Sequence, residues 1–513
     1  MHWTRMKAVF LHLDRTLPVP IYLQIKESIR ELIVQGTLRP GERLPSTRQL
    51  SDKLGINRMT VDAAFRRLEA DGLIQSHVGR GSFVSPLDST LEAKAKPEYD
   101  PEAAARFWTP LFVDSRTNPV SLPTMSPRAG SRSISFVAAA PGPELFPAIE
   151  FRRCADFVLK RRISEISRIG SSDGLASLKS YLARWFSQNG MEVSDEEIII
   201  TTGCQQAMDL VRKLLLGAAD SLVMGNPNYP GAVAALAPTS TERLPMPMVG
   251  TEIDGRGLTS LLSQGRSKLI YTVPNFHNPT GASMPLESRR QLCALASQFR
   301  VPILEDDVFG ELRYSGPVLP TLRSLRPEVV IYIGSFSKML TPALRVGWMI
   351  APRPVIQQLN ILKQSADLHT NLLIQATMEE FCRRDLLNRH MRRMRRVFVK
   401  RRDAMAEALR RHFPDESRFD VPDGGLSMWV TLPSDCNTDE LARLSDERGV
   451  RFLPGSAFYF RSHMHHSLRL SFASETEEKI EQGIRTLGSL LGNRKSRLYF
   501  TEQPARERAQ PIV

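Results

Sequence analysis

Short β-branched runs alternate with longer helical patterns through most of the chain from about Ser133 onward. The runs are EEIIITTG, SKLIYTVPN, VPILEDD and VVIYIGS, and one of the helical patterns is RRQLCALASQF. Such alternation is typical of an α/β fold, because a helix between two strands lets them lie parallel in one sheet. Past about Leu362, long helical patterns lead to the mixed segments GGLSMWVTL and SLRLSFA. We therefore expect a large α/β domain with a mainly parallel sheet, followed by a smaller C-terminal α+β subdomain.

The first 86 residues follow a different pattern. Isoleucines recur at helical spacing between positions 20 and 36, and Ser46 and Asn57 are suited to cap two further helices, the last of which runs to about Ala70. The segment GLIQSHVGRGSFV then predicts a hairpin whose turn contains Gly79 and Gly81. Three helices and a glycine-tipped hairpin together predict a winged helix-turn-helix.

The chain of 513 residues is too long to fold around one ordinary hydrophobic core, so we expect roughly two to four domains. We expect residues 1–86 to form the winged helix. Residues 87–132, rich in Pro, Ala and Ser, have the composition of a linker. Residues 133–492 are expected to form the α/β domain with its subdomain, and the charged segment 493–513 is expected to be disordered.

The charge balance favours a polyanionic partner. The chain has 68 Lys and Arg residues against 55 Asp and Glu residues, a formal net charge of +13. Residues 1–86 contain 13 basic and 8 acidic residues, an excess of +5 that points to nucleic acid.

The spacing of the cysteines and the length of the apolar stretches indicate the cellular compartment of the protein. The five cysteines are widely spread without a C-x-x-C pair, which argues against a disulfide framework and a thiolate zinc site. No apolar stretch reaches the roughly 18 residues that a membrane helix needs. We therefore expect a cytoplasmic protein without a membrane segment.

Five side chains are placed to contact double-stranded DNA. Arg58 and Thr60 lie in the first turn of the third predicted helix, the part that a helix-turn-helix presents to the major groove. Arg43 and Arg48 lie near the start of the second helix, and Arg80 lies at the hairpin tip, where it can enter the minor groove. An isolated surface arginine is usually only solvated, but the joint placement of these residues favours a DNA-binding face.

Residues 20–84 resemble the GntR-family winged helix nearly end to end. One small departure is Asn57, where the family usually has serine. Both residues cap helices, so the departure does not affect the expected fold. The resemblance implies a DNA-binding role for this part of the chain.

A second set of residues fits an aldehyde cofactor. A lysine at a pocket edge can form a Schiff base with pyridoxal 5'-phosphate (PLP), which also needs a carboxylate at its ring nitrogen and donors for its phosphate. The candidates, in chain order, are Gly203, Cys204, Gln205, Tyr229, Asn278, Asp306, Ser335, Ser337, Lys338 and Arg345. Each has an ordinary alternative when taken singly, such as a solvated lysine, a turn, a helix cap or a packing residue. The ordered set favours a cofactor site.

This ordered set resembles the fold-type I aminotransferases over about residues 134–490. The matching motifs are NPTG, EDDVFGELRY, GSFSKML followed by TPALRVGW, and LRLSFA. The resemblance implies that Lys338 holds PLP as a Schiff base and that Asp306 stabilises the protonated ring nitrogen. It also implies that Asn278 bonds the phenolic oxygen of PLP and that Tyr229 stacks on the ring.

The phosphate of the cofactor and a substrate carboxylate have their own expected partners. The phosphate donors are the helix start at Gly203, Cys204 and Gln205, together with Ser335, Ser337 and Arg345. By the same resemblance, Arg469 receives an α-carboxylate in a bidentate pair. The alternative for Arg469 is a structural ion pair.

Two departures from the aminotransferase pattern concern catalysis. Phe309 stands where the pattern has a tyrosine whose hydroxyl would bond the phenolic oxygen, and Cys204 replaces a more usual serine. Lys338 and Asp306 are intact. We therefore expect cofactor binding, with partial transamination or amine exchange rather than efficient turnover.

Two further features have competing interpretations. The segment 388–405 places many arginines on one predicted helix, which either extends the DNA-binding surface or forms a solvated face; its apolar stripe of Met391, Met394, Phe398 and Met405 favours the second. The HMHH motif lacks a supporting carboxylate pattern, so we expect surface histidines and no metal site.

A GntR-type winged helix joined to an aminotransferase-like domain resembles the MocR-type transcription regulators over about nine tenths of the chain. That family implies a PLP-binding regulator that forms a homodimer, often head to tail, on an operator with repeated half-sites. Its effector would be a small amino compound or PLP itself. Two alternatives remain: an active aminotransferase with an accessory DNA-binding domain, and a cofactor-free dimerisation scaffold.

Overall fold

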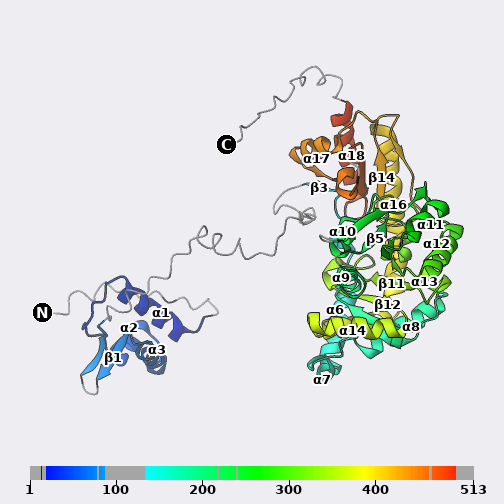
Figure 1. Cartoon of the computed structure of the whole chain (residues 1–513). Helices are drawn as coiled ribbons and strands as arrows, with labels where there is room; N and C mark the ends of the chain where they lie inside the picture. The colour runs from blue at the N-terminus through cyan, green and yellow to red at the C-terminus, as the bar shows by residue number, and fades with distance from the viewer. Residues whose placement is uncertain are drawn as a thin grey trace, which may run out of the picture. The chain divides into compact units, whose positions relative to one another are not determined.

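The computed structural model describes residues 13, 19–77, 80–86, 133–217, 219–237, 241–461 and 465–492. The chain divides into two compact units, Met1–Val113 and Asp114–Val513 (Figure 1). The expected linker at 87–132, the expected tail at 493–513 and Gly79 of the hairpin turn lie outside the described residues.

Three helices form the body of the N-terminal unit: α1 (Ile21–Val34), α2 (Thr47–Leu54) and α3 (Arg58–Ala70). Ser46 and Gln49 form a capping box at the start of α2, and Asn57 accepts a hydrogen bond from the backbone N–H of Met59 at the start of α3. The buried faces of the three helices share one hydrophobic core. The helices and caps expected from the sequence are thus confirmed.

A two-stranded wing completes the N-terminal unit. β1 (Ile74–His77) and β2 (Gly81–Val84) pair in antiparallel fashion, with Ile74 opposite Val84. Gly81 has a φ of +100°, a backbone conformation that favours glycine. Arg43 forms an isolated bridge to Phe83, which ties the wing to the segment before α2. This arrangement confirms the winged helix-turn-helix.

A seven-stranded sheet lies at the centre of the C-terminal unit. In sheet order its strands are β4 (Ile198–Thr201), β12 (Gly347–Ile350), β11 (Val330–Ser335), β10 (Ile303–Asp306), β9 (Ser267–Thr272), β5 (Ser221–Met224) and β6 (Glu242–Pro245). Only β12 is antiparallel to its neighbours. Apart from β6 at one edge, nearly every strand residue is buried, which explains the continuous apolar runs in the sequence. The mainly parallel sheet is confirmed.

Helices cover both faces of this sheet. Successive residues of a strand point to opposite faces, and those on the two faces pack in different hydrophobic clusters. One face packs against α9 (Cys204–Leu215), α10 (Pro230–Leu236) and α14 (Arg353–Asp367). The other face packs against α8 (Ala176–Gln188), α11 (Gly255–Ser263), α12 (Leu286–Phe299) and α13 (Leu322–Leu325). The result is the three-layer arrangement of an α/β domain.

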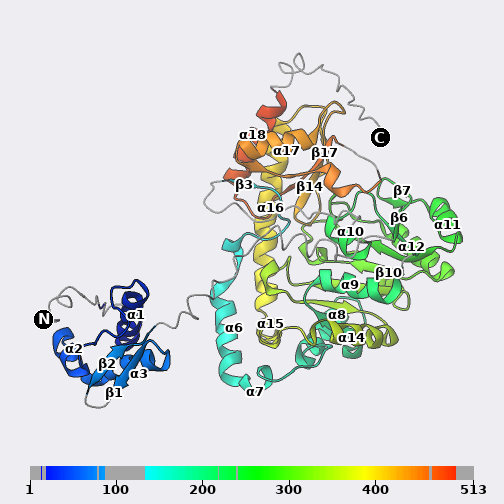
Figure 2. The ribbon, with the colours of Figure 1, turned by 60° about the vertical axis from the view of Figure 1, so that its left-hand side comes forward.

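A second sheet is antiparallel and belongs to the C-terminal subdomain. Its strands, in order, are β13 (Arg418–Phe419), β14 (Ser427–Thr431), β17 (Ser467–Ser471) and β16 (Leu453–Pro454). The accompanying helices are α16 (Leu386–His412), α17 (Thr438–Glu447) and α18 (Glu477–Gly492). Figure 2 shows α16 running from this subdomain down beside the larger domain. The expected α+β subdomain is confirmed.

The first described segment of the C-terminal unit pairs with a strand of the C-terminal subdomain. β3 (Ile134–Ser135) pairs in parallel with β15 (Val450–Arg451). The remaining elements are α6 (Ala148–Arg161), α7 (Ile163–Ile166), α15 (Leu372–Arg383) and the small hairpin of β7 (Met248–Val249) and β8 (Glu252–Ile253). Within the described ranges, no helix is both long and apolar enough to cross a membrane.

Candidate cofactor and DNA-binding sites

Three consecutive acidic residues lie at the end of β10, and each has different partners. Glu305 accepts hydrogen bonds of 2.9 and 2.8 Å from two backbone N–H groups at the start of α13, so it caps that helix. Asp307 accepts hydrogen bonds from the amide of Asn275 at 2.9 Å and from the hydroxyl of Tyr332 at 3.1 Å. Both oxygens of these two carboxylates accept hydrogen bonds from within the fold, whereas one oxygen of Asp306, between them, does not.

Asp306 has one satisfied and one unsatisfied carboxylate oxygen. Oδ2 accepts a hydrogen bond of 2.8 Å from the hydroxyl of Tyr271, whereas the buried Oδ1 has no partner in the described structure. Burial raises the pKa of Asp306 to about 7, and the hydrogen bond from Tyr271 opposes that rise. A protonated nitrogen at Oδ1 would satisfy this oxygen and favour the ionised carboxylate.

Lys338 lies in the turn that follows β11. Its Nζ donates a hydrogen bond of 2.7 Å to the carbonyl of Ala139, in the segment that follows β3. Burial lowers the pKa of Lys338 to about 8, and the charge of Arg469 acts in the same direction. A lysine with this pKa is substantially neutral slightly above physiological pH, as a nucleophile toward an aldehyde must be.

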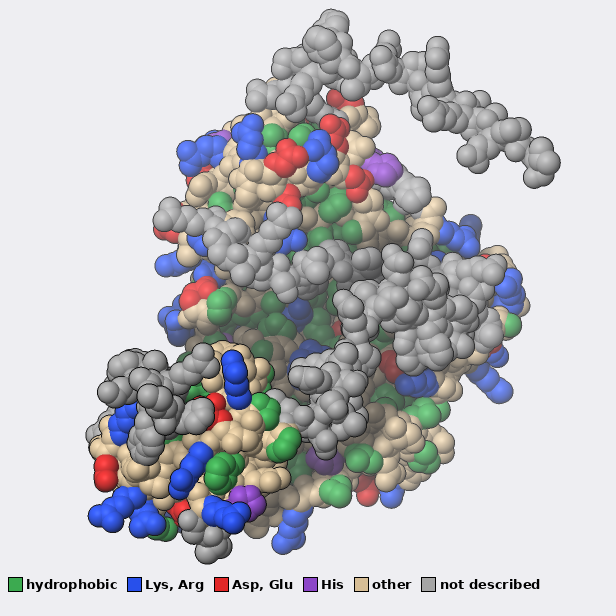
Figure 3. All heavy atoms as spheres, turned by 90° about the vertical axis from the view of Figure 1, so that its left-hand side faces the viewer, with side chains coloured by type: hydrophobic (Ala, Val, Ile, Leu, Met, Phe, Trp, Pro, Cys, Tyr) green, Lys and Arg blue, Asp and Glu red, His purple; other side chains and the backbone are tan. Residues whose placement is uncertain are grey.

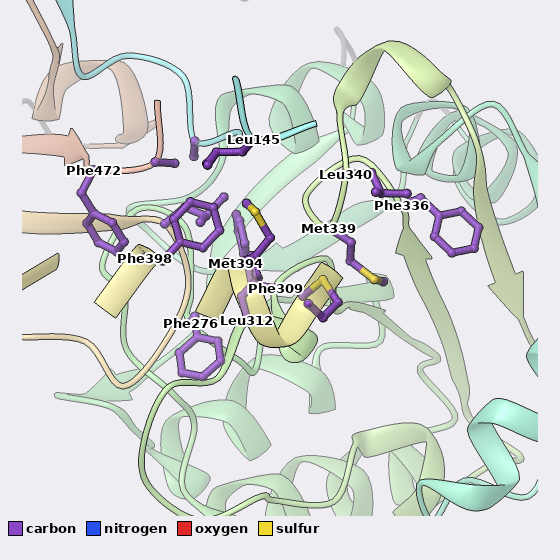
Figure 4. Packing of buried hydrophobic residues seen from close by; sticks show 14 of the residues in the cluster. Leu145, Phe276, Phe309, Leu312, Phe336, Met339, Leu340, Met394, Phe398 and Phe472 are labelled. Carbon is purple, nitrogen blue, oxygen red and sulfur yellow. The ribbon is translucent and has the colours of Figure 1, made fainter. Parts of the chain in front are cut away.

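Phe309 packs beside this lysine. Its ring centroid lies 6.0 Å from Nζ of Lys338, and the side chain is 4 % exposed. Phe309 belongs to the same buried cluster as Met339, the residue after Lys338, and Met394 of α16 (Figure 4). The position at which the aminotransferase pattern has tyrosine therefore contributes apolar packing around the lysine turn.

The start of α9 and Arg345 form a cradle suited to a phosphate. A Cβ at Gly203 would lie 2.8 Å from Nη2 of Arg345, so the guanidinium lies directly beside the helix N-terminus. Gly203 has a φ of +104°, which favours glycine. Free backbone N–H groups and a guanidinium at one point attract an anion with several oxygens.

The other predicted phosphate donors lie around the same cradle, and some are already hydrogen-bonded. Ser335 donates to the carbonyl of Val346 at 3.1 Å, and its Oγ lies 2.8 Å from Oγ of Ser337. The amide of Gln205 donates to the carbonyl of Gly231 at 3.0 Å. Ser335 and Gln205 thus also stabilise the local turns, which the sequence did not indicate.

Cys204 is the first residue of α9. Burial raises the pKa of its thiol well above the usual range, so the group is a neutral thiol at physiological pH. The charges of Lys338 and Arg345 act on it in the opposite direction. The Cys204 side chain is thus a weak donor, and the backbone N–H groups of the α9 start are the stronger anion ligands.

Tyr229 lies at the start of α10 and is half-buried in the site. Burial raises the pKa of its hydroxyl, and the neighbouring Asp306 adds to the effect. A Cβ at Gly231 would lie 2.4 Å from Cζ of Tyr229, so only glycine at 231 leaves room for this ring. The ring is thereby positioned near Asp306, where an aromatic cofactor would stack.

Arg469 and Asn278 are joined in the interior. Nη1 of Arg469 donates a hydrogen bond of 2.9 Å to Oδ1 of Asn278, and Nη2 donates to the carbonyl of Val137. Nε is buried without a partner in the described structure, and no carboxylate pairs with the guanidinium there. Burial lowers the pKa of Arg469 to about 10. Among the described residues, Arg469 therefore does not form the structural ion pair that was the alternative for it.

Three contributors to the site were not predicted from the sequence: Tyr271, Val137 and Ala139. Tyr271 is a fully buried tyrosine in a parallel strand, and a buried hydroxyl needs a partner, so its position in SKLIYTVPN was a usable signal. Val137 and Ala139 act through backbone carbonyls. Backbone atoms leave no trace in side-chain identity, so no sequence pattern could have identified them.

The predicted DNA contacts are exposed on the N-terminal unit. Arg43, Arg48, Arg58 and Arg80 are exposed, and Thr60 is half-buried. Arg58 begins α3, and the guanidinium of Arg43 lies over Gly81 of the wing, within about 3.0 Å of where a Cβ would be. Arg43 therefore belongs both to the wing and to the segment before α2. Figure 3 shows Lys and Arg side chains distributed over one face of this unit.

Three other cations of the unit, unlike these arginines, form ion pairs. Lys26 pairs with Asp71, Arg30 with Glu27, and Arg66 with Asp62. By contrast, the four arginines predicted to contact DNA form no ion pair in the described part of the unit; they are Arg43, Arg48, Arg58 and Arg80. Unpaired cations beside the start of α3 and on the wing are available to phosphates.

Two family models match the chain. The model of the bacterial regulatory proteins of the gntR family matches residues 21–84, and the model of aminotransferase class I and II matches residues 152–487. The first range coincides with the winged helix and the second with the α/β domain and its subdomain. Groups of three or more His, Cys, Asp or Glu residues that could hold a metal ion are absent from the described ranges.

Similar proteins fall into two groups. The HTH-type transcriptional regulator TauR of Rhodobacter capsulatus is 30% identical over 91% of this chain and 96% of its own length. The probable rhizopine catabolism regulatory protein MocR of Rhizobium meliloti is 28% identical over 93% and 95% of the two chains. The crystal structure of LysN, an α-aminoadipate aminotransferase of Thermus thermophilus complexed with N-(5'-phosphopyridoxyl)-L-leucine, superposes with a TM-score of 0.67 at 34% identity, covering 71% of this chain and 93% of LysN.

Fold and sites together define a winged-helix DNA-binding protein with a fold-type I aminotransferase-like PLP domain. The transcriptional regulators match nearly the full length, whereas the aminotransferase matches only the larger unit. The chain belongs to the MocR-type transcription regulators. Its residues fit PLP, since Oδ1 of Asp306 lacks a partner and the Gly203–Arg345 cradle suits a phosphate.

Proposed function

We propose that this regulator senses an amino compound that carries a carboxylate, through its PLP domain, and changes its DNA occupancy in response. The observation that carries the proposal is Arg469. Its guanidinium is buried beside Asn278 with an unused Nε and no carboxylate partner among the described residues. A buried unpaired cation is unfavourable, so an anionic ligand at this point would be bound strongly.

Lys338 and Asp306 are proposed to hold the reactive part of the cofactor. When bound, PLP supplies an aldehyde that joins reversibly to amines and a ring that withdraws electrons. Burial keeps the Lys338 amine available for attachment, and the Ala139 carbonyl orients it. Asp306, oriented by Tyr271, presents Oδ1 to a ring N–H.

The remaining cofactor contacts follow from the same geometry. We assign the phosphate to the cradle of Gly203, Cys204, Gln205, Ser335, Ser337 and Arg345. Tyr229 supplies the stacking face. Asn278, already joined to Arg469, supplies a donor for the phenolic oxygen. One amide would thereby contact both the cofactor and the arginine that binds the effector carboxylate.

A homodimer is part of the proposal. Apolar side chains are exposed along α6, α7 and the turn after them: Ile149 at 60%, Ile163 at 54% and Ile169 at 86%. Several exposed large apolar side chains in one part of a protein favour an interface there. A second copy covering it would place two winged helices on one DNA, as an operator with repeated half-sites requires.

The test uses the full chain loaded with PLP and a DNA fragment selected for its affinity to the protein. A panel of α-amino acids, ω-amino acids and amines without a carboxylate is titrated while PLP absorbance and DNA affinity are recorded. We expect carboxylate-bearing amines to change both signals, and Arg469→Lys to weaken that response by about 10-fold or more, because a point charge replaces a planar pair.

Lys338→Ala separates the proposal from a simpler regulator. We expect this variant to lose the absorbance change and the effector-dependent change in DNA affinity together, because it has no amine to exchange. Unchanged effector control in Lys338→Ala would disprove sensing through the cofactor. If PLP alone changes DNA affinity while no amine in the panel does, the effector is PLP itself.

An active aminotransferase is the second candidate, because Lys338, Asp306 and Arg469 are all present in one site. Repeated transfer of an amino group to a keto acid at ordinary enzymatic rates would support it. A single half-reaction that then stops would support the regulator. Phe309 favours the second outcome, since it supplies packing where a hydroxyl would otherwise tune the cofactor.

A further inference from the structure

The first half of α16 carries a surface of arginines that neither the cofactor site nor the winged helix uses. We call Arg389, Arg392, Arg393, Arg396 and Lys400 the α16 basic face. All five are exposed, and none has an ion pair in the part of the chain that the structure describes. Arg389, Arg392 and Arg396, with the neighbouring Arg395, line one shallow groove.

Helix geometry places these five residues together. At about 100° per residue, they fall within an arc of about 100° on one side of α16. The opposite side contains Leu387, Met391, Met394 and Phe398, all buried in the core of the C-terminal unit. The apolar stripe therefore explains why α16 packs as it does, but it does not explain the concentration of positive charge on the other side.

The α16 basic face also lacks the acidic partners that other exposed arginines have. No Asp or Glu occurs between Leu386 and Arg402. Elsewhere, exposed arginines such as Arg266, Arg353 and Arg443 form ion pairs with nearby glutamates. Like charges three and four residues apart destabilise a helix, so this arrangement is unfavourable for the free protein and would be relieved by a bound polyanion.

We propose that the α16 basic face binds the phosphate backbone of DNA, as a second contact surface besides the winged helix. The five cations lie within 12 consecutive residues, and the 11 steps from Arg389 to Lys400 cover about 16 Å of helix axis. Over that length a DNA duplex carries on the order of nine phosphate charges. Guanidinium groups suit phosphate oxygens because they can donate two parallel hydrogen bonds.

Two other partners fit this surface less well. A membrane-surface helix would expose apolar side chains next to its cations, whereas the apolar side of α16 is buried. A two-fold contact between copies would place the arginines against themselves. The acidic group beside the groove, Glu311, is already paired with Arg395 at 3.1 Å.

The test compares two triple variants of the full-length, PLP-loaded protein. The first is Arg389→Ala, Arg392→Ala and Arg396→Ala. The second, with the same loss of charge, is Arg266→Ala, Arg353→Ala and Arg443→Ala, which removes arginines that already have partners. Affinity for DNA is measured between 50 and 200 mM salt. Because alanine favours helices, we expect the first variant to keep its thermal stability.

Each lost phosphate contact reduces the slope of log affinity against log salt by about 0.9. The α16 variant should therefore lose up to about 2.7 of that slope per chain. Over the fourfold rise in salt, the factor by which wild-type affinity falls should then be up to about 40 times the factor for the variant. The control variant should keep the wild-type slope. Equal slopes for both variants would overturn the proposal.

Specificity distinguishes this surface from the winged helix. The α16 variant should weaken binding to the selected fragment and to unrelated DNA by the same factor, because phosphate contacts carry no sequence information. Arg58→Ala should instead reduce the preference between the two DNAs. An α16 variant that changes only the oligomeric state would also overturn the proposal. Loss of preference in Arg58→Ala with wild-type slopes in the α16 variant would leave the winged helix as the sole DNA contact.

Discussion

At the level of single residues, the cofactor site is marked by buried polar groups with unused hydrogen-bonding capacity. Oδ1 of Asp306 and Nε of Arg469 both lack partners in the described structure, although most buried polar atoms in proteins are paired. The neighbouring Glu305 and Asp307 are fully engaged. This contrast between adjacent carboxylates identifies the one that is available to a ligand.

Asp306→Asn should weaken PLP binding by about 10- to 100-fold, because it removes a charge-assisted hydrogen bond worth about 1.5–3 kcal/mol. The side-chain oxygen of asparagine can still accept from Tyr271, so the fold should be retained. A titration of cofactor absorbance measures the effect. Glu305→Gln is the matched control, since it changes a buried acid on the same strand that only caps α13. Equal loss of PLP affinity in both variants would contradict the assignment of Asp306.

The pKa of Lys338 predicts a pH dependence for cofactor attachment. Burial lowers this pKa to about 8, so below pH 8 the neutral, nucleophilic form falls about tenfold per pH unit. The rate at which the unloaded protein attaches added PLP should therefore rise with pH and level off above about pH 8. Stopped-flow absorbance measures this rate. A rate that still increases up to pH 10 would mean that Lys338 has the pKa of an exposed lysine.

At the level of elements, the ligand groups gather where strands and helices end. Asp306 ends β10, Lys338 follows β11, and α9 begins at the phosphate cradle. In parallel sheets the carboxyl ends of neighbouring strands lie at one edge, and helices that follow them point their N-termini there. The order β11-β10-β9 thus brings distant motifs together.

Gly203→Ala should impair PLP binding through its phosphate. The added Cβ would lie 2.8 Å from Nη2 of Arg345, and the φ of +104° is unfavourable for alanine. We expect at least a tenfold loss of PLP affinity by absorbance titration. Gly190→Ala is the control, because that glycine also has a positive φ, +84°, but nothing lies within 4 Å. If both variants lose stability but keep PLP affinity, the cradle does not hold the phosphate.

At the level of the whole molecule, the chain combines a DNA-binding unit with a larger unit that exposes apolar surface. Ile163 and Ile169 belong to that surface, with exposures of 54% and 86%. A net charge of +13 supports binding to DNA but does not by itself hold two copies together. The apolar surface is the better candidate for dimerisation.

Ile163→Arg combined with Ile169→Arg should weaken dimerisation at least tenfold, because two desolvated apolar contacts would be replaced by charges. Sedimentation velocity over a range of concentrations measures the change, and DNA affinity should fall with it. Val318→Arg is the control, since this side chain is equally exposed, at 85%, in another part of the unit. Unchanged assembly in the double variant would place the interface elsewhere.

The sequence was sufficient for most of the fold. The caps Ser46 and Asn57, the apolar periods and the β-branched runs act locally, so they specify the winged helix and the α/β layers without knowledge of distant contacts. The ordered motifs around Asp306 and Lys338 also identified the kind of site. They did so because each side chain type is tied to a chemical task.

Contacts between distant segments were decided only in the tertiary structure. Lys338 donates a hydrogen bond to Ala139, 199 residues away in the sequence, and Arg469 donates one to Asn278, 191 residues away. Such contacts depend on how the strands are ordered and on backbone carbonyls, neither of which side-chain patterns encode. The same holds for α16, whose apolar stripe and arginines are both visible in the sequence. Only the packed helix shows that the stripe is buried while the α16 basic face has no ion pair among the described residues, because ion pairing depends on what lies opposite in space.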